Sequence, residues 1–92
     1  MNQKLIDFAA IMTQMFLSGL MFNYNFNYQE LEEIVNRTLK AAKFNQHDTK
    51  PAVLFLRTFL ASLALNFDAE FHELEEITQR ALLKVETGAV KH

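Results

Sequence analysis

The chain has 92 residues, half of them hydrophobic, and it carries a formal net charge of −2. It contains two Gly, one Pro and no Cys, a composition that excludes a disordered chain, a disulfide scaffold and a Cys-ligated zinc or iron–sulfur site. The slightly acidic balance argues against a protein that coats nucleic acid through an overall positive field. A chain of this length has room for one domain.

The N-terminal 22 residues form a largely apolar stretch with some features of a secretory signal. Asp7, Thr13 and Gln14 interrupt it, and no small residues spaced as in a cleavage site follow. The most apolar segment, residues 52–65, contains Arg57 and is shorter than the roughly 20 apolar residues that a bilayer core requires. We therefore expect no membrane span and take the cytoplasm as the default location.

The spacing of apolar residues predicts four helices, at 3–22, 27–43, 50–65 and 70–86. Asn25 or Asn27 is a candidate N-cap of the second helix, and Asp68 is a candidate N-cap of the fourth. The reason is chemical: a short side-chain oxygen accepts one of the orphan backbone N–H groups at a helix start.

The third helix follows a polar break at residues 45–48. Asp48 or Thr49 is its candidate N-cap, and Pro51 falls in its first turn, where a missing N–H costs little. Gly88 is expected to end the fourth helix, which leaves residues 87–92 as a flexible tail.

The two halves of the chain resemble each other. When the sequence is shifted by 43 positions, residues 16–40 fall on residues 59–83 without a gap, and 11 of the 25 pairs are identical. We interpret this match as the duplication of a unit of about 43 residues. A solenoid of the HEAT or armadillo type has a similar period, but two repeats are too few to bury a continuous core.

The prediction is therefore an all-α protein of four helices, built from two αα-hairpins in a compact bundle with pseudo-two-fold symmetry. Hairpin 1 covers residues 1–45, hairpin 2 covers residues 46–86, and together they form a single helical domain, 1–86.

The four helices differ in where their apolar residues lie. The helices at 27–43 and 70–86 each have one apolar stripe, whereas those at 3–22 and 50–65 are apolar around their circumference. In the first helix, one face carries Phe8, Met12, Met15, Phe16 and Gly19, and the opposite side carries Ile6, Ala10, Leu17 and Met21.

A helix that is apolar on all sides belongs at the centre of a large structure or at an interface, and a chain of 92 residues has little centre. We therefore predict a homo-oligomer, most simply a dimer. The alternative is that these two helices pack in the middle of a monomeric bundle. The candidate interface residues are Ile6, Leu17, Met21, Tyr24, Phe26, Phe55 and Phe59.

Paired carboxylates recur at the same place in both halves, as Glu30 with Glu33 and Glu73 with Glu76. Facing pairs of this kind hold two divalent metals in ferritin-like bundles, but those sites also use a Glu-x-x-His element that this chain lacks. A solvated face of ion pairs explains the spacing better, and we expect no metal or other cofactor. We also expect no catalytic residues, because there is no Cys, no serine motif and no Gly-rich phosphate loop.

Residues 23–28 alternate Asn with aromatic residues. Such a segment can present stacking surfaces to a base or a peptide, although matching aromatic residues in the second half favour a structural turn. Arg37, Lys40 and Lys43 form a modest basic end on the second helix.

The sequence thus favours a small non-enzymatic interaction or regulatory protein that works through self-association and protein binding. The alternatives are a helical bundle that binds a small molecule or a divalent metal and, third, a regulator associated with nucleic acid.

Overall fold

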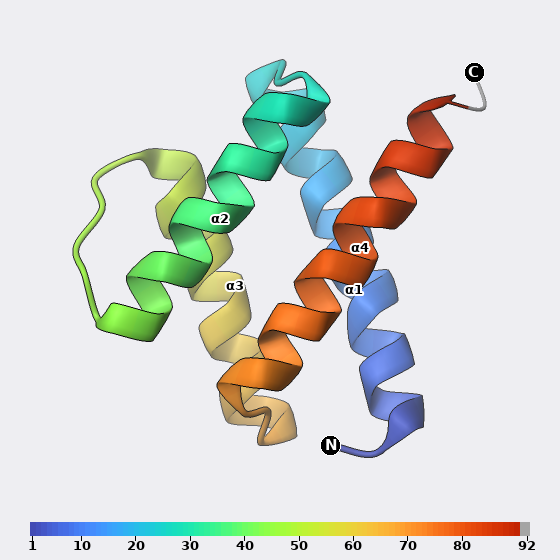
Figure 1. Ribbon diagram of the computed structural model, residues 1–92, viewed down its shortest axis with the longest axis vertical. Helices are drawn as coiled ribbons and strands as arrows, with labels where there is room; N and C mark the ends of the chain where they lie inside the picture. The colour runs from blue at the N-terminus through green and yellow to red at the C-terminus, as the bar shows by residue number, and fades with distance from the viewer. Residues whose placement is uncertain (91–92) are drawn as a thin grey trace.

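The computed structural model describes the backbone of residues 1–90 and the side chains of residues 1–88. Within this range it contains four helices and no strand, which confirms the all-α prediction (Figure 1). The helices are α1 (Gln3–Tyr24), α2 (Tyr28–Phe44), α3 (Pro51–Phe67) and α4 (Phe71–Val90).

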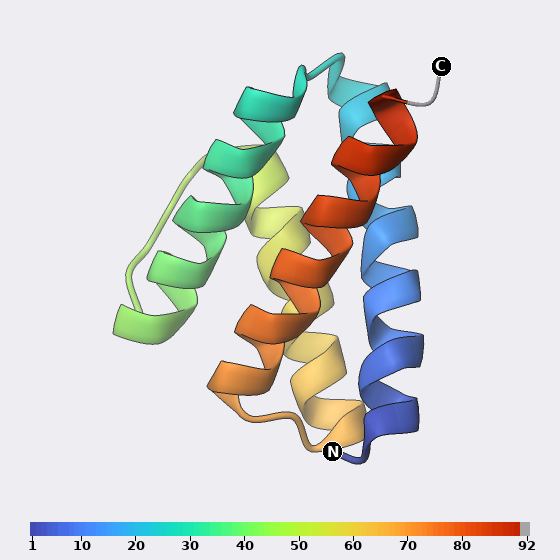
Figure 2. The same ribbon diagram turned by 45° about the vertical axis from the view of Figure 1, so that its right-hand side comes forward.

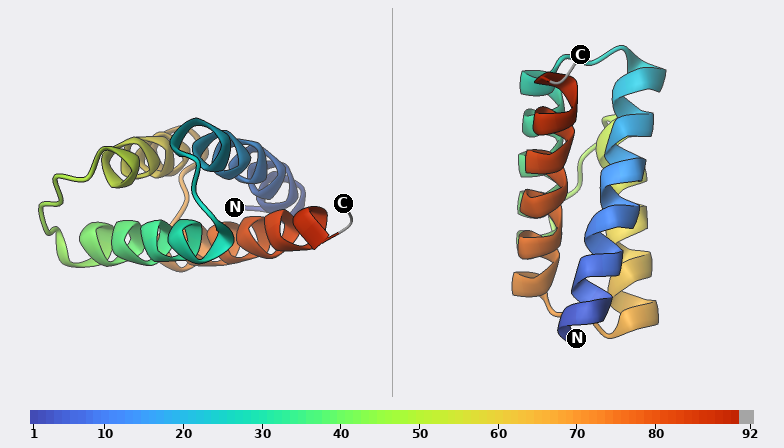
Figure 3. Two further views of the ribbon diagram at one scale, coloured as in Figure 1. Left: turned by 90° about the horizontal axis from the view of Figure 1, so that it is seen from above. Right: turned by 90° about the vertical axis from the view of Figure 1, so that its right-hand side faces the viewer.

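The helices form two layers, with α1 and α3 in one layer and α2 and α4 in the other (Figure 3). The Cα atoms span 35 × 32 × 16 Å. Because packed helices lie about 8–10 Å apart, the shortest dimension has room for two layers and no third. Each helix therefore has one side that faces outward, and neither α1 nor α3 is enclosed in the middle of the bundle.

The main helix contacts join the two halves of the chain. The most extensive are between α1 and α4, which lie side by side in Figure 2, and between α2 and α3. Contacts between α1 and α2, and between α3 and α4, are smaller. Each half thus packs one helix against the other half instead of closing as a separate hairpin.

The turns after α1 and α3 have the same geometry. Asn25 and Asp68 both adopt the left-handed conformation, with φ of 54°, and each is the C-cap of the helix that precedes it. The prediction that they are N-caps is therefore wrong for both. Asn and Asp are the residues that tolerate this conformation best after Gly.

The start of α2 confirms the other candidate, Asn27. Its side chain accepts the backbone N–H of Glu30, and the Glu30 carboxylate accepts the backbone N–H of Asn27 at 3.0 Å. This reciprocal arrangement is a capping box, which satisfies two otherwise unpaired donors at the helix start.

The start of α3 differs from the prediction. Lys50 is the N-cap and makes no side-chain capping bond, while Pro51 occupies the first turn as expected. Asp48 accepts the backbone N–H of Lys50 and binds the guanidinium of Arg37 through two bonds of 2.8 and 3.0 Å. It therefore fixes the loop to α2 and does not cap α3.

The end of α4 also differs from the prediction. Gly88 lies inside the helix, which continues to Val90. An αL conformation is the usual reason for glycine at a helix end, and Gly88 does not adopt it. The C-terminal part of the predicted tail, residues 91–92, lies outside the described residues.

The core lies between the two layers and draws on all four helices. Its largest fully buried side chains include Leu17, Leu31, Leu56 and Ile77. The apolar stripes predicted for α2 and α4 face this core. Three threonines are also buried, and each hydroxyl donates to the carbonyl four residues earlier, so that no polar group is left unsatisfied there: Thr13, Thr38 and Thr78.

The sequence match between the halves corresponds to matching positions in the fold. Leu17 and Leu60, which are 43 positions apart, are both buried, and the rings of Phe16 and Phe59 stack on each other where α1 and α3 approach. The pairing of α1 with α4 is likewise equivalent to that of α3 with α2. An origin by duplication stays a hypothesis.

Candidate functional site

The outer face of the α1–α3 layer carries most of the exposed apolar surface among the described side chains. Ten large hydrophobic residues are exposed, and eight of them belong to these two helices. On α1 they are Phe8, Ile11, Met15, Phe22 and Tyr24, and on α3 they are Leu54, Phe55 and Leu65. We call these eight residues the outer apolar face.

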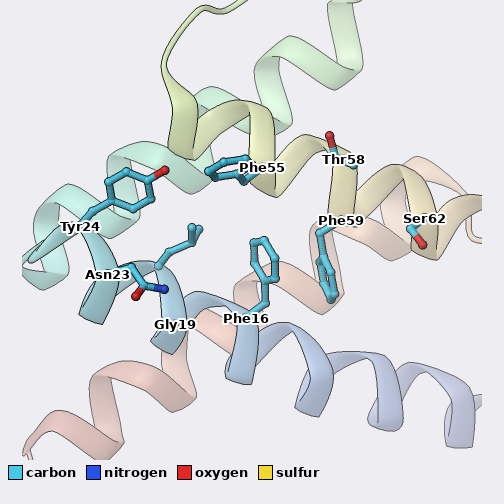
Figure 4. A pocket seen from close by; sticks show the side chains of 9 residues that line it. Phe16, Gly19, Asn23, Tyr24, Phe55, Thr58, Phe59 and Ser62 are labelled. Carbon is cyan, nitrogen blue, oxygen red and sulfur yellow. The ribbon is translucent and has the colours of Figure 1, made fainter.

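A groove runs between α1 and α3 on this side of the molecule (Figure 4). Its volume is about 870 Å³, within the range of 300–1,000 Å³ that is usual for ligand sites. Four aromatic rings line it, those of Phe16, Tyr24, Phe55 and Phe59. The rings of Phe16 and Phe59 stack with their centroids 4.4 Å apart, and those of Tyr24 and Phe55 lie 6.5 Å apart.

The polar groups in the groove are neutral. Asn23 contributes an amide, Tyr24, Thr58 and Ser62 contribute three hydroxyls, and no charged side chain lines the groove. The Thr58 hydroxyl donates to the carbonyl of Leu54 at 2.8 Å, so it is already used within α3. The site therefore favours apolar contact and offers few directional bonds.

The predicted interface residues divide into core and surface. Ile6 and Leu17 are buried in the core and are not available to a partner in this fold. Met21 and Phe26 are partly buried and pack against the core. Tyr24, Phe55 and Phe59 line the groove. The prediction was thus wrong for the first two residues, and only the last three lie together in the groove.

The physical reason for this error is that both sides of α1 are apolar. The side with Ile6, Ala10 and Leu17 packs inward, and the side with Phe8 and Met15 faces outward. The sequence separated the two sides correctly, but apolarity alone did not tell which one was inside.

The outward side of α1 has apolar residues spaced by seven, but the buried side, with Ile6, Thr13 and Leu20, has the same spacing, so this interval does not distinguish the two sides. Phe8, Met15 and Phe22 follow one another at this interval and are 52%, 71% and 87% exposed. Together with Ile11 and Ser18 they form a stripe like the seam of a coiled coil. No prediction was made for Phe22 and Leu65, the two most exposed of the large hydrophobic residues.

The repeated carboxylates have structural roles at helix starts. The capping box holds Glu30, and the carboxylate of Glu73 accepts the backbone N–H of Glu70 at 2.9 Å. Glu33 and Glu76 lie 3.9 Å from Arg37 and Arg80 as ion pairs within their own helices. Among the described residues, no three His, Asp or Glu side chains converge as metal ligands would.

Glu73 also joins the start of α4 to the N-terminus. Its Oε2 receives a hydrogen bond of 2.8 Å from the N-terminal ammonium of Met1. The N–H of Glu70 and this ammonium lower the pKa of the Glu73 carboxyl, and the same carboxylate raises the pKa of the Met1 amino group. The pair therefore stabilises the contact of α1 with α4 while both groups are charged.

Within residues 1–88, the histidines and basic residues do not form a shared site. His72 is exposed on α4, with Nδ1 3.3 Å from Glu70. On α2, Arg37 is bound to Asp48, while Lys43 lies over the rings of Phe44 and Phe71.

By length and composition α1 is able to cross a membrane, although about a third of its most apolar stretch is buried inside the protein. The core helices of globular proteins have the same properties, so this finding leaves the expectation of no span as a prediction.

Comparisons with models of protein families, with curated proteins and with solved structures give no match for this chain. Any functional conclusion therefore depends on the residues and the geometry described above.

Proposed function

We propose that this protein acts by association and not by catalysis, and that the outer apolar face is its binding surface. The observation that carries the proposal is the concentration of eight exposed apolar residues on one layer. Monomeric proteins rarely expose a contiguous apolar patch of more than a few hundred Å², and larger patches are typical of protein contact sites.

The distribution of charge supports the same assignment. α1 carries only Lys4 and Asp7, and α3 carries only Arg57, whereas α2 and α4 carry six charged residues each. Charged residues are depleted at the centre of protein interfaces, and aromatic residues and Met are enriched there. The α1–α3 layer has this composition, and the α2–α4 layer has that of a solvated surface.

The test compares substitutions on the two layers. A double variant, Met15→Glu with Leu65→Glu, places two charges on the outer apolar face, where both wild-type side chains are exposed. Leu83→Glu is the matched control, since Leu83 is an exposed apolar residue of α4. We expect the double variant to fold with the thermal stability of dilute, dissociated wild type and to lose every association that wild type makes, while the control keeps it.

The test covers two kinds of association. Sedimentation measures association of the chain with itself, and capture on immobilised chain measures association with other proteins. Binding that persists in the double variant would contradict the proposal. So would binding that is lost equally in Leu83→Glu.

The groove favours a second candidate function, the binding of a small neutral apolar molecule. Its volume and its four aromatic rings suit such a ligand. Titration with the neutral fluorescent probe N-phenyl-1-naphthylamine measures this binding. We expect Ser62→Leu, which narrows the groove, to abolish the fluorescence rise if the groove is the site. An unchanged titration would reject it.

A further inference from the structure

A glycine in the middle of α1 is not explained by the chain's own packing. Gly19 lies at the edge of the groove, and a Cβ built on it meets nothing within 4 Å. Its φ is not positive, so it does not need the conformational freedom of glycine either. Glycine weakens a helix interior, and it is useful where a backbone must be approached closely. The only open approach is from outside the protein.

The residues around Gly19 are also small. Ser18 adjoins it, and Ser62, with Ala61 next to it, is the equivalent residue 43 positions further along and lines the groove toward its other end, beyond the rings of Phe16 and Phe59 (Figure 4). Large apolar residues of the outer face lie along the same helices on both sides of this point. The groove is therefore lined by small residues at two equivalent places and flanked by large apolar residues, a shape that admits a crossing helix.

The exposed area of this face suits a stable dimer. The eight residues of the outer apolar face are on average about 60% exposed, and four of them are aromatic, a kind of side chain that buries about 150–250 Å². They present roughly 800 Å² of apolar surface, which is about what each partner contributes to an interface of standard size.

The absence of charge on the face is compatible with a second copy. In a two-fold dimer the same patch meets itself, so a charge close to the two-fold axis faces its own copy. None of the eight residues is charged, and the groove contains no charged side chain. A face without charge avoids this repulsion, whereas a charged partner would find no complementary group on it.

We propose that the outer apolar face binds a second copy of this chain, α1–α3 layer on α1–α3 layer, with the closest helix crossing at Gly19. This inference rests on the proposed function, because it names the partner of the same surface.

A lipid surface is the competing occupant, and the charges disfavour it. Helices that lie on membranes carry Lys and Arg along the polar side that borders the apolar face. Here Lys4 and Arg57 are the only such residues on α1 and α3. Moreover, Arg57 is held by the carbonyl of Gln46 at 2.6 Å and the amide oxygen of Asn45 at 3.2 Å.

The experiment uses the two glycines of the chain as matched positions. At Gly88, as at Gly19, an added Cβ meets nothing within 4 Å. Both Gly19→Ala and Gly88→Ala should raise the melting temperature of dilute protein, because alanine is the better helix former. Only Gly19→Ala should weaken the dimer, raising its dissociation constant by about tenfold through overpacking of the crossing. Sedimentation velocity over a dilution series measures this constant.

A single cysteine gives an independent readout, because the chain contains no Cys. With a short bis-maleimide, Ser62→Cys should crosslink to its own copy much faster than Glu33→Cys, which lies on α2 and is exposed. Equal crosslinking rates would overturn the proposed packing, as would a dissociation constant that Gly19→Ala leaves unchanged.

Other outcomes separate this inference from the proposed function. A protein that is monomeric at every concentration overturns the proposal that the partner is a second copy. The proposed function then stands if capture of another protein is lost in Met15→Glu with Leu65→Glu and kept in Leu83→Glu. A monomer that cosediments with phosphatidylcholine vesicles overturns the inference and assigns the face to lipid. A dimer that survives the double variant overturns both.

Discussion

The two layers of this protein bury their apolar residues in different ways. The helices α2 and α4 have one apolar side, which faces the core, and their other side is charged. The helices α1 and α3 contribute equally to the core but are apolar outside as well. The core alone therefore does not account for the apolar residues of α1 and α3. Their outer side requires an explanation outside the folded chain.

The largest expected effect on the free energy of unfolding comes from substitutions on the inner side of α1, compared with its outer side. Leu17→Ala removes a fully buried side chain and should lower the free energy of unfolding by about 2–5 kcal/mol. Phe22→Ala, at an 87% exposed position, should change it by about 0.5 kcal/mol or less. Denaturant unfolding of dilute protein measures both. Similar losses for the two variants would break the distinction between the two sides.

A smaller loss of stability is expected from removing a cap, and it distinguishes the start of α2 from the start of α3. Asn27→Ala removes the side chain that caps α2 and should cost about 1 kcal/mol of stability. Lys50 makes no capping bond at the start of α3, so Lys50→Ala should cost much less. Thermal unfolding of the two variants side by side checks this. A larger loss for Lys50→Ala would show that the loop before α3 depends on that side chain.

The smallest effect concerns the contact of α1 with α4 and depends on pH. The pKa of Glu73 is lowered in the fold, so its contribution is present at neutral pH and is lost as the pH falls below 4.5, through the folded-state pKa. The pKa of the Met1 amino group is raised, so its contribution is present below pH 8.0 and is lost as the pH rises through the folded-state value.

Glu73→Gln should reduce both of these pH dependences, measured as melting temperatures from acid to alkaline buffer. Glu75→Gln is the control, because Glu75 is exposed on the same helix. If Glu73→Gln keeps the full pH profile of wild type, the ion pair with Met1 does not contribute to stability.

The helices were predictable because their signals are local. The apolar spacing placed all four, and the inward stripes of α2 and α4 followed from residues such as Leu31 and Ile77. The errors at Asn25 and Asp68 arose because the same residue types serve as N-caps and as left-handed C-caps. Only the position of the helix end distinguishes the two roles.

The candidate site was less predictable because it depends on packing between distant segments. Ile6 and Leu17 were chosen for the interface, and only the contact of α1 with α4 shows that they lie inside. The groove requires the stacking of Phe16 on Phe59, which no local pattern encodes. The role proposed for Gly19 likewise depends on the empty space beside it, which the sequence does not show.

The central claim is that the outer apolar face of α1 and α3 associates with a second copy. Size-exclusion chromatography with light scattering, over a dilution series of the wild-type chain, tests it most directly. We predict a mass of twice 10.7 kDa that persists on dilution to low micromolar concentration. A mass of 10.7 kDa at every concentration would contradict the claim.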